Sequence, residues 1–163
     1  MATNTHISGE SSFSITISDF KNGGNIPSHY TCSGANVSPV VQFNNPPAGA
    51  ASLAFIIEDP DAPSGLFIHW LLYNMPPGLA ALPEGLKAGA QVSGIGTQGK
   101  SSYGGSGYSG PCPPPGATHH YHFRAYALDL APDLPAGLTA SQFKSRINGH
   151  ILAETDWLGL FKR

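Results

Sequence analysis

Three apolar runs, each about the length of one β-strand, constrain the fold of this chain more than any other feature. They span residues 53–57, 66–73 and 121–128, and proline, glycine or acidic residues flank them. The first run is apolar on both faces, and only His69 interrupts the second. The first two runs have the continuous apolar sequence that is typical of strands buried on both faces, whereas the third also contains His122 and Arg124. We therefore predict three central strands of one large sheet.

Glycine and proline are abundant between the apolar runs. The chain of 163 residues holds 20 glycines and 15 prolines, and their positions between apolar runs indicate a compact, loop-rich protein instead of a disordered one. Near the start, Phe13, Ile15 and Ile17 alternate with serine and threonine, which predicts a half-buried strand. Residues 85–109 are rich in glycine and serine. There we expect a long ordered loop or a mobile flap, which in its functional form would be an active-site lid.

One segment near the C-terminus has the pattern of a helix. Thr139 can cap the helix and Gln142 follows three residues later, which is a capping box. Apolar side chains then follow at i, i+4 and i+8, from Phe143 to Ile151, and would form one face. Residues 156–163 hold four large apolar side chains. We expect them to form either a second short helix or a strand that packs on the core.

These elements together predict a mostly-β fold. Short strands separated by turns, with helical structure only at the end, indicate a β-sandwich with a large central sheet and one or two C-terminal helices. A chain of this length is most simply one domain, residues 1–163.

The charge balance and the apolar runs exclude several classes of protein. Lysine and arginine total 8 against 10 acidic residues, for a net charge of −2, and no basic block is present. This argues against a nucleic-acid-binding protein. The apolar runs are too short to be transmembrane segments. The first residues have neither a basic start nor an apolar signal core, so we expect a cytoplasmic protein.

The two cysteines allow two interpretations. Cys32 and Cys112 could form a single bridge in an oxidising compartment. Neither cysteine belongs to a Cys-x-x-Cys or Cys-x-x-His motif, which a metal site would need. We expect two reduced, mostly buried thiols.

Acids, histidines and prolines gather in three stretches beside the apolar runs. The first is Asp-Pro-Asp-Ala-Pro at 59–63, the second is His-Trp at 69–70, and the third spans 108–121. The prolines restrict the backbone, so both carboxylates of the first stretch lie on a stiff turn. Asp59 can either close this turn or enter a site. Asp61, which lies between two prolines, is expected to point into a pocket.

His69 is the polar residue of the second apolar run. With the period of a strand it would share a face with Phe67, Leu71 and Tyr73. A histidine in such a strand is usually a core residue whose hydrogen bonds are satisfied. Asp61 comes just before this strand, so we expect the two side chains to pair.

Four consecutive polar or aromatic residues begin the third central strand. His119 and Tyr121 are two residues apart and project to one face, whereas His120 and His122 project to the other. This division makes a zinc site less favourable, although three histidines and two aspartates could in principle bind zinc.

A catalytic nucleophile has no clear candidate. Serines lie near the histidine cluster at positions 101, 102, 106 and 109, but no Gly-x-Ser-x-Gly motif follows a strand and opens a helix. Cys112 lies between two prolines, which gives little scope for activation by a helix N-terminus. We therefore favour a small anion-binding pocket. Histidines, a tyrosine hydroxyl and backbone N–H groups would donate hydrogen bonds there, and the aspartates would hold the histidines in their donor tautomer.

The same motifs resemble those of a known family. DPDAP, then HW followed by Asn74-Met75-Pro76, then GYSGPCPPPG..H.Y are similar to the phosphatidylethanolamine-binding protein family, also called Raf-kinase-inhibitor-like, and above all to its bacterial and archaeal branch. The opening SDFKNGGNIPSHYTCSGANVSP and the closing GHILAETDWLGLFKR also resemble this family, so the likeness covers nearly the whole chain.

This resemblance implies a β-sandwich-like fold with an anion pocket and no cofactor. The ligand-binding residues that it implies are Asp59, Asp61, His69, Pro111, His119 and Tyr121. Family members bind phosphate-like head groups, phosphorylated peptides or small carboxylates, several inhibit kinases or proteases, and many prokaryotic members are homodimers. We thus expect a non-enzymatic binding or inhibitor module. The alternatives are a hydrolase that uses a loop serine with His119, a metal-dependent enzyme, and an interaction protein with a vestigial pocket.

The chain departs from the family pattern at His120, where the family usually has arginine. If that arginine pairs with a carboxylate outside the pocket, the pair is either lost here or becomes dependent on pH.

Overall fold

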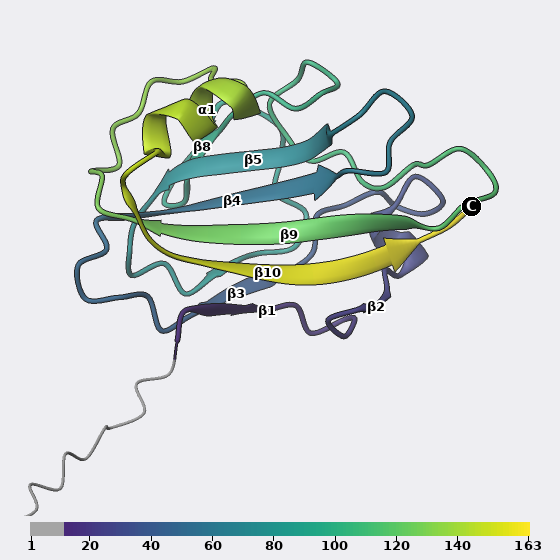
Figure 1. The fold of residues 1–163 in the computed structure, drawn as a ribbon, viewed down its shortest axis with the longest axis horizontal. Coiled ribbons are helices and arrows are strands. Elements are labelled where there is room, and N and C mark those ends of the chain that lie inside the picture. Colours follow the sequence, from purple (N-terminus) through teal and green to yellow (C-terminus); the bar gives the residue numbers. More distant parts are fainter. Residues whose placement is uncertain (1–11) are drawn as a thin grey trace, which may run out of the picture.

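The three apolar runs form the adjacent central strands of a seven-stranded sheet. A computed structural model describes residues 12–163, and Figure 1 shows its strands and single α-helix. The order in the large sheet is β2-β10-β9-β4-β5-β8-β7. The bounds are β2 Gly24–Asn25, β10 Ile151–Phe161, β9 His119–Leu128, β4 Ser52–Asp59, β5 Phe67–Met75, β8 Gly96–Gln98 and β7 Gln91–Val92. The prediction of three central strands is confirmed.

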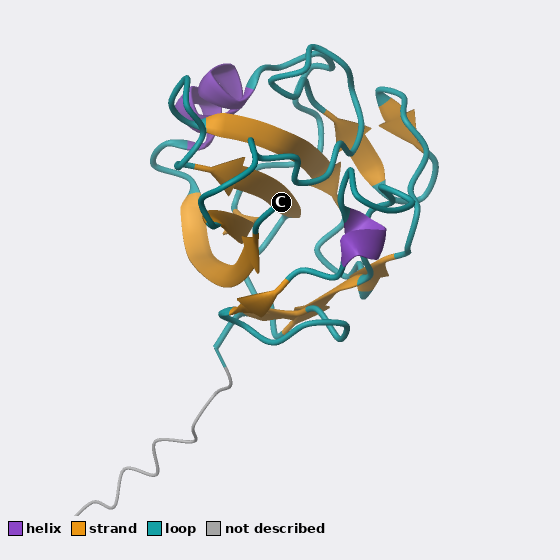
Figure 2. Cartoon of the chain, turned by 90° about the vertical axis from the view of Figure 1, so that its right-hand side faces the viewer, coloured by secondary structure: helices purple, strands orange, loops and turns teal. Residues whose placement is uncertain are grey.

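A smaller sheet covers one face of the large sheet. Its strands are β1 Ser14–Thr16, β3 Val41–Asn44 and β6 Ala81–Leu82, in the order β1-β3-β6. The strand predicted from the alternation around Ile15 is therefore present as β1. A short 3-10 helix, η1 Ser28–Tyr30, follows β2. In Figure 2 the helical segment at the upper left lies outside the strands. The mostly-β sandwich is thus confirmed.

The core has one layer on each face of the large sheet. On the face toward the small sheet, the largest buried side chains include Phe55, Trp70, Tyr121 and Phe123. On the other face, Ile56, Leu71, Tyr73 and Tyr126 pack with the helix. Every residue of β4 is buried. This strand needs apolar side chains on both faces because it lies in the middle of the sheet.

The single α-helix, α1 Ala140–Ile147, begins with the predicted capping box. The Thr139 hydroxyl accepts a hydrogen bond from the backbone N–H of Gln142 at 3.2 Å, and the Gln142 side chain accepts one from the Thr139 N–H at 3.0 Å. The helix ends one turn earlier than the apolar pattern predicts. Gly149 takes a left-handed conformation with φ of 82°, which helices tolerate just past their ends. Ile151 therefore belongs to β10 and not to the helical face.

The C-terminal segment is a strand, which decides between the two structures expected for residues 156–163. β10 pairs antiparallel with β9, from Ile151 opposite Leu128 to Phe161 opposite His119. The fold therefore has one C-terminal helix. No helix within residues 12–163 is long and apolar enough to cross a membrane.

The glycine-rich region at 85–109 is ordered. It contains the short strands β7 and β8, which extend the large sheet beyond β5. The Gln98 side chain accepts a hydrogen bond from the indole N–H of Trp70 at 2.7 Å and donates to the carbonyls of Lys87 and Gly89. Of the two alternatives for this region, the structure shows the ordered loop.

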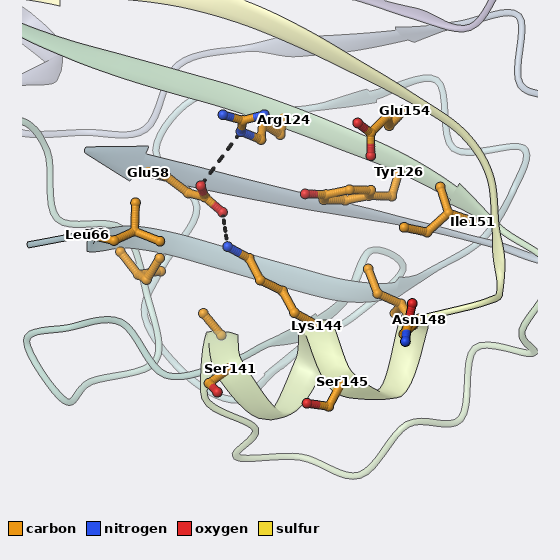
Figure 3. Close-up of a pocket in the computed structure, with 13 residues that line it drawn as sticks. Glu58, Leu66, Arg124, Tyr126, Ser141, Lys144, Ser145, Asn148, Ile151 and Glu154 are labelled. Atoms are coloured by element: carbon orange, nitrogen blue, oxygen red, sulfur yellow. Dashed lines mark ion pairs between the residues drawn. The ribbon is translucent and has the colours of Figure 1, made fainter. Parts of the chain in front are cut away.

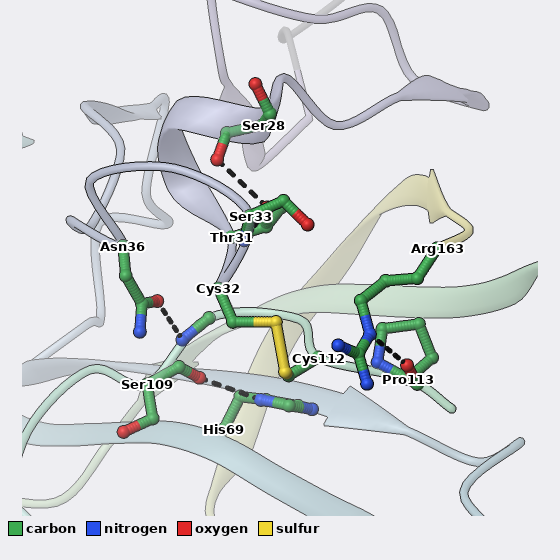
Figure 4. The surroundings of a disulfide bond; sticks show 11 residues. Ser28, Thr31, Cys32, Ser33, Asn36, His69, Ser109, Cys112, Pro113 and Arg163 are labelled. Carbon is green, nitrogen blue, oxygen red and sulfur yellow. Dashed lines mark hydrogen bonds between the residues drawn. A yellow bond between two sulfur atoms is a disulfide. The ribbon is translucent and has the colours of Figure 1, made fainter. Parts of the chain in front are cut away.

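Cys32 and Cys112 form a disulfide, so the prediction of two reduced thiols is wrong. Their Cα atoms are 5.4 Å apart although 80 residues separate them in the chain. Figure 4 shows the bond between the segment after η1 and the segment before β9. The fold brings these two segments together, and the spacing of the cysteines in the sequence carries no information about that distance.

Candidate functional site

A cavity of about 240 Å³ lies beside the ends of the three central strands β4, β5 and β9. Because β4 runs antiparallel to both β5 and β9, the end of β4 lies beside the beginnings of its two neighbours. These strand ends bring together the three polar stretches found in the sequence. Four of the six predicted site residues line the cavity: Asp59, His69, His119 and Tyr121.

A β-bulge in β5 directs His69 toward this cavity. Ile57 is opposite Trp70, but the next residue, Glu58, is opposite Ile68, so His69 is the extra residue. His69 and Trp70 therefore lie on the same side of the sheet, and the His69 ring is 5.4 Å from that of Tyr121. Bulges re-aim side chains in this way.

The bulge overturns part of the face predicted for His69. Phe67 does lie beside it, with ring centroids 4.8 Å apart. Leu71 and Tyr73 belong to the opposite face, where they pack in the layer next to α1. Strict alternation along a strand cannot anticipate an inserted residue, so the face predicted for Leu71 and Tyr73 is wrong.

His119 and Asp59 form a buried pair. His119 Nδ1 donates to Asp59 Oδ2 at 2.7 Å, and the side chains are 8% and 4% exposed. The other oxygen of Asp59 accepts from the Asp61 N–H at 2.8 Å. Asp59 therefore takes both of the roles considered for it, since it closes the turn and holds the His119 ring.

The hydrogen bonds fix which nitrogen each cavity histidine presents. His69 Nδ1 lies 2.7 Å from the carbonyl oxygen of Ser109. A carbonyl and a carboxylate can only accept, so Nδ1 must carry the proton in His69 and in His119. In the neutral rings Nε2 is then an acceptor. This is opposite to the donor tautomer expected from the sequence.

The environment of His69 favours its neutral form. Burial lowers the pKa of this ring, and the Ser109 carbonyl and the Asp59 carboxylate oppose that effect without overcoming it. A charge on His69 therefore requires something in the cavity that stabilises it.

Tyr121 contributes a hydroxyl with no partner in the described part of the chain. The residue is fully buried, and within residues 12–163 its hydroxyl makes no hydrogen bond. Its ring lies on the same face as that of His119, with centroids 6.3 Å apart, which confirms the face predicted for these two residues. Burial, together with the nearby carboxylates of Asp59 and Asp61, raises the pKa of the hydroxyl. The group therefore remains a neutral donor.

Asp61 does not line the cavity, and its predicted pairing with His69 is wrong. It accepts hydrogen bonds from the backbone N–H and from Nδ1 of His120, at 2.8 and 2.7 Å, in an exposed position. The side-chain bond from His120 is the main cause of the lowered pKa of Asp61. The pair lies outside the cavity, and His120 stands where the resemblance led us to expect an arginine.

The Pro111 segment forms part of the cavity wall, but Pro111 is not among the lining residues. Its neighbours Cys112, Pro113 and Pro114 line the cavity instead. The carbonyl of Pro111 accepts a hydrogen bond from the Cys32 N–H at 3.1 Å. Pro111 therefore helps to position the wall.

Three lining residues lie outside the polar stretches found in the sequence: Ser64, Phe67 and Tyr103. Tyr103 belongs to the glycine-rich region, and its ring packs against Phe67 at 4.8 Å, 6.1 Å from the ring of His69. Only the lid interpretation of residues 85–109 offered a signal for it. Burial raises the pKa of Tyr103, although the residue is 55% exposed at the rim.

The serines considered as nucleophiles lie outside this cavity. The hydroxyls of Ser101 and Ser102 accept backbone hydrogen bonds from Tyr103 and Ile68. Ser64 is the serine among the lining residues. Within residues 12–163 no three histidine, cysteine or acidic side chains are grouped as a metal ion would need.

A larger groove of about 790 Å³ lies on the opposite face, between the sheet and α1. On its floor the buried Glu58 pairs with Lys144 at 2.6 Å and with Arg124 at 3.6 Å, as Figure 3 shows. The charged groups compensate one another, and the groove is open. The smaller cavity is the better candidate site because it combines two histidines with an unpaired hydroxyl.

Comparisons with known proteins agree with the fold and the motifs. The family model described as phosphatidylethanolamine-binding protein matches residues 16–162. A UPF0098 protein of Methanothermobacter thermautotrophicus is 42% identical over 144 residues, which cover 88% of this chain and 95% of that protein. A UPF0098 protein of Pyrococcus horikoshii is 38% identical over 159 residues, covering 95% of this chain and 80% of its own.

Two solved structures have the same fold. CT736 of Chlamydia trachomatis, described as a phosphatidylethanolamine-binding protein homologue, has a TM-score of 0.83 and 37% identity, and the match covers 93% of this chain and 97% of that one. YbcL of Escherichia coli has a TM-score of 0.84 and 26% identity, over 94% and 99% of the two chains.

Proposed function

The chain belongs to the phosphatidylethanolamine-binding protein family, and from this premise we propose that its cavity binds a small anion without chemical turnover. The ligand is a phosphate, a phosphorylated head group or a carboxylate. His69, His119 and Tyr121 contact it, and Asp59 holds His119 in place. We take the whole chain, residues 1–163, as one such domain.

The Tyr121 hydroxyl is the observation that carries this proposal. Leaving a buried hydroxyl without a partner costs about 1–3 kcal/mol. The group lies in a cavity of about 240 Å³ that two histidines share. An oxygen atom of an anion would accept its hydrogen bond and remove that cost.

The tautomers of His69 and His119 imply that the anion binds together with a proton. With Nδ1 committed to Ser109 and Asp59, each neutral ring presents a lone pair at Nε2, which repels a fully ionised oxygen. Either a ring is protonated and donates from Nε2, or an acidic O–H of the ligand donates to Nε2. Affinity then falls with rising pH, through the pKa of the ring in the first case and through the pKa of the ligand's O–H in the second.

Calorimetric titration with inorganic phosphate and with phosphoethanolamine tests the proposal. We expect binding by the natural chain and at least tenfold weaker binding by Tyr121→Phe, because the variant lacks the donor. Tyr126→Phe is the matched control, since Tyr126 lies on the opposite face of β9 near α1, and it should bind normally. Equal affinities of the natural chain and Tyr121→Phe would exclude this mode of binding.

A hydrolase is the second candidate function, favoured by the buried His119–Asp59 pair. Such a pair orients the general base in nucleophilic catalysis, and Ser64 is the lining residue that would act as nucleophile. Turnover of phosphate or carboxylate esters by the natural chain, lost in Ser64→Ala, would favour the enzyme. Binding without turnover favours the anion-binding module.

Family membership supports a proposal about the wider role. We propose that anion binding lets the module modulate or inhibit a kinase or protease, and that the module forms a homodimer. Cytoplasmic localisation stays a prediction from the sequence. The Cys32–Cys112 disulfide favours an oxidising compartment instead.

A further inference from the structure

A disulfide forms part of the wall of the proposed anion cavity. Cys112 lines the cavity and is exposed to solvent, and its sulfur is bonded to that of Cys32. In Figure 4 this bond joins the segment that carries Ser33 and Asn36 to the one that carries Ser109 and Pro113. One wall of the site therefore contains a covalent bond to a solvent-exposed residue.

The wall has few other attachments because of its prolines. Residues 111–115 read PCPPP, and proline has no N–H to donate. Within residues 12–163, two hydrogen bonds reach the wall: the Cys32 N–H donates to the Pro111 carbonyl at 3.1 Å, and Arg163 Nε donates to the Pro113 carbonyl at 2.6 Å. The disulfide is therefore the covalent attachment of the wall, beside these two hydrogen bonds.

The stretch just before the wall orients a ligand-binding residue. The Ser109 carbonyl holds His69 Nδ1, and the N–H of Gly110 donates to the side chain of Asn36 at 2.8 Å. A Cβ on Gly110 would collide with the Tyr30 carbonyl, so the two backbones are in close contact. Because this contact is made with the segment that carries Cys32, the disulfide acts on the carbonyl that positions His69.

We propose that the Cys32–Cys112 disulfide is a redox-controlled clamp, whose reduction by a dithiol releases the wall and weakens anion binding. This proposal rests on the anion-binding function proposed above. The ligand contacts themselves remain in the reduced protein, since they come from β5 and β9. What reduction removes is the order of the wall and of the Ser109 carbonyl, which must then be restored on binding.

The redox step is an ordinary thiol–disulfide exchange. A thiolate of the dithiol attacks the sulfur of Cys112, which is the more exposed of the two residues. The bond between the cysteines breaks, and Cys32 leaves as a thiolate that takes up a proton. The second thiol of the reagent then displaces Cys112, which is protonated in turn. Two electrons and two protons pass from the dithiol to the protein, and the dithiol becomes a disulfide.

The test compares inorganic phosphate binding by the full chain before and after treatment with dithiothreitol. We expect the affinity of the reduced protein to be roughly three- to tenfold lower, the cost of ordering one or two groups on binding. Amide hydrogen exchange without ligand is the second readout. Exchange at Ser109, Gly110 and Cys112 should become at least tenfold faster, while that of β4 stays unchanged.

Two variants serve as controls. The double variant Cys32→Ser with Cys112→Ser should behave as the reduced protein and show no response to dithiothreitol. Asn36→Ala loosens the Gly110 contact without touching the cysteines. It should weaken phosphate binding to a smaller extent in both redox states, and it keeps the test open if the double variant fails to fold.

The outcomes separate the clamp from the site. Phosphate binding that is the same in the oxidised and reduced proteins would overturn the clamp and leave the anion site standing. Unchanged amide exchange at the wall would overturn the clamp whatever the ligand does. If the oxidised protein binds neither phosphate nor phosphoethanolamine, the proposed function fails, and the clamp fails with it as a control of binding.

Discussion

Glu58 and Asp59 are neighbours at the end of β4, yet they belong to opposite faces of the sheet and to different kinds of site. Glu58 lies under α1 and forms ion pairs with Lys144 and Arg124. Asp59 lies in the cavity and accepts a hydrogen bond from the His119 ring. Two buried carboxylates one residue apart thus form an ion pair on one face and a hydrogen bond to a ring nitrogen on the other.

The partners of each pair also differ in their access to water. Lys144 and Arg124 are each more than a third exposed, so either cation can turn to solvent if Glu58 is lost. His119 is 8% exposed, and its Nδ1–H has Asp59 as its acceptor. Burial of the partner, and not of the carboxylate alone, therefore decides how much unfolding free energy is lost when the carboxylate is removed.

The largest expected effect is that of Asp59→Ala. The variant leaves the buried Nδ1–H of His119 without an acceptor, which should cost about 1–3 kcal/mol of unfolding free energy. Phosphate binding should also be lost because the ring is no longer held. Urea unfolding and calorimetry measure the two effects. Retention of full phosphate affinity would show that Asp59 does not position His119.

Glu58→Ala, the matched change one residue earlier, should have a smaller effect. The two cations that it leaves can reach water, so we expect a loss of about 1 kcal/mol, as for partly exposed ion pairs, and unchanged phosphate affinity. The same two measurements apply. A loss of phosphate binding in this variant would break the distinction between the two faces.

Phosphate binding should also depend on pH through the histidines of the cavity. Burial lowers the pKa of His69 in the free protein, so its contribution to stability is full above about 6.5 and declines as pH falls through the lowered value. Bound anion favours the charged ring and opposes this decline. The rise in melting temperature caused by phosphate should therefore grow from about pH 8 to about pH 6. A constant shift over this range would exclude histidine charge as a contributor.

Asp61→Asn should have the smallest effect. The bond from His120 lowers the pKa of Asp61 below 3.8, so the stabilisation is present above that value and is lost as pH falls through the lowered one. The pair is exposed, so we expect a loss of only about 0.2–1 kcal/mol at neutral pH and unchanged phosphate affinity. Thermal unfolding at neutral and strongly acidic pH measures the difference, which should vanish in acid. Impaired phosphate binding would return Asp61 to the site.

Periodicity and local chemistry were sufficient to predict much of the fold and part of the site. The central strands, the capping box at Thr139 and the shared face of His119 and Tyr121 depend on residues close together in the chain. These features were predictable because side chains alternate along a strand and repeat with the spacing of a helix turn. The resemblance of the motifs likewise indicated the family.

Long-range pairing decided the rest. Whether Asp59 or Asp61 meets His119 depends on how β4 and β9 align across 60 residues of chain. The bulge at His69 depends on the register between β4 and β5, and the position of Tyr103 depends on the path of a loop. No local pattern reports these alignments, because they are settled by the packing of the whole core.

Local sequence patterns settle which residues can form strands, which faces those strands can bury, and that histidines and acids gather at the strand ends. These properties follow from covalent geometry and from the exclusion of apolar side chains from water. Only the tertiary structure decided which acid meets which histidine, which ring nitrogen faces the cavity, and that Cys32 lies within bonding distance of Cys112. Those outcomes require distances between segments far apart in the chain, and only the folded core sets them.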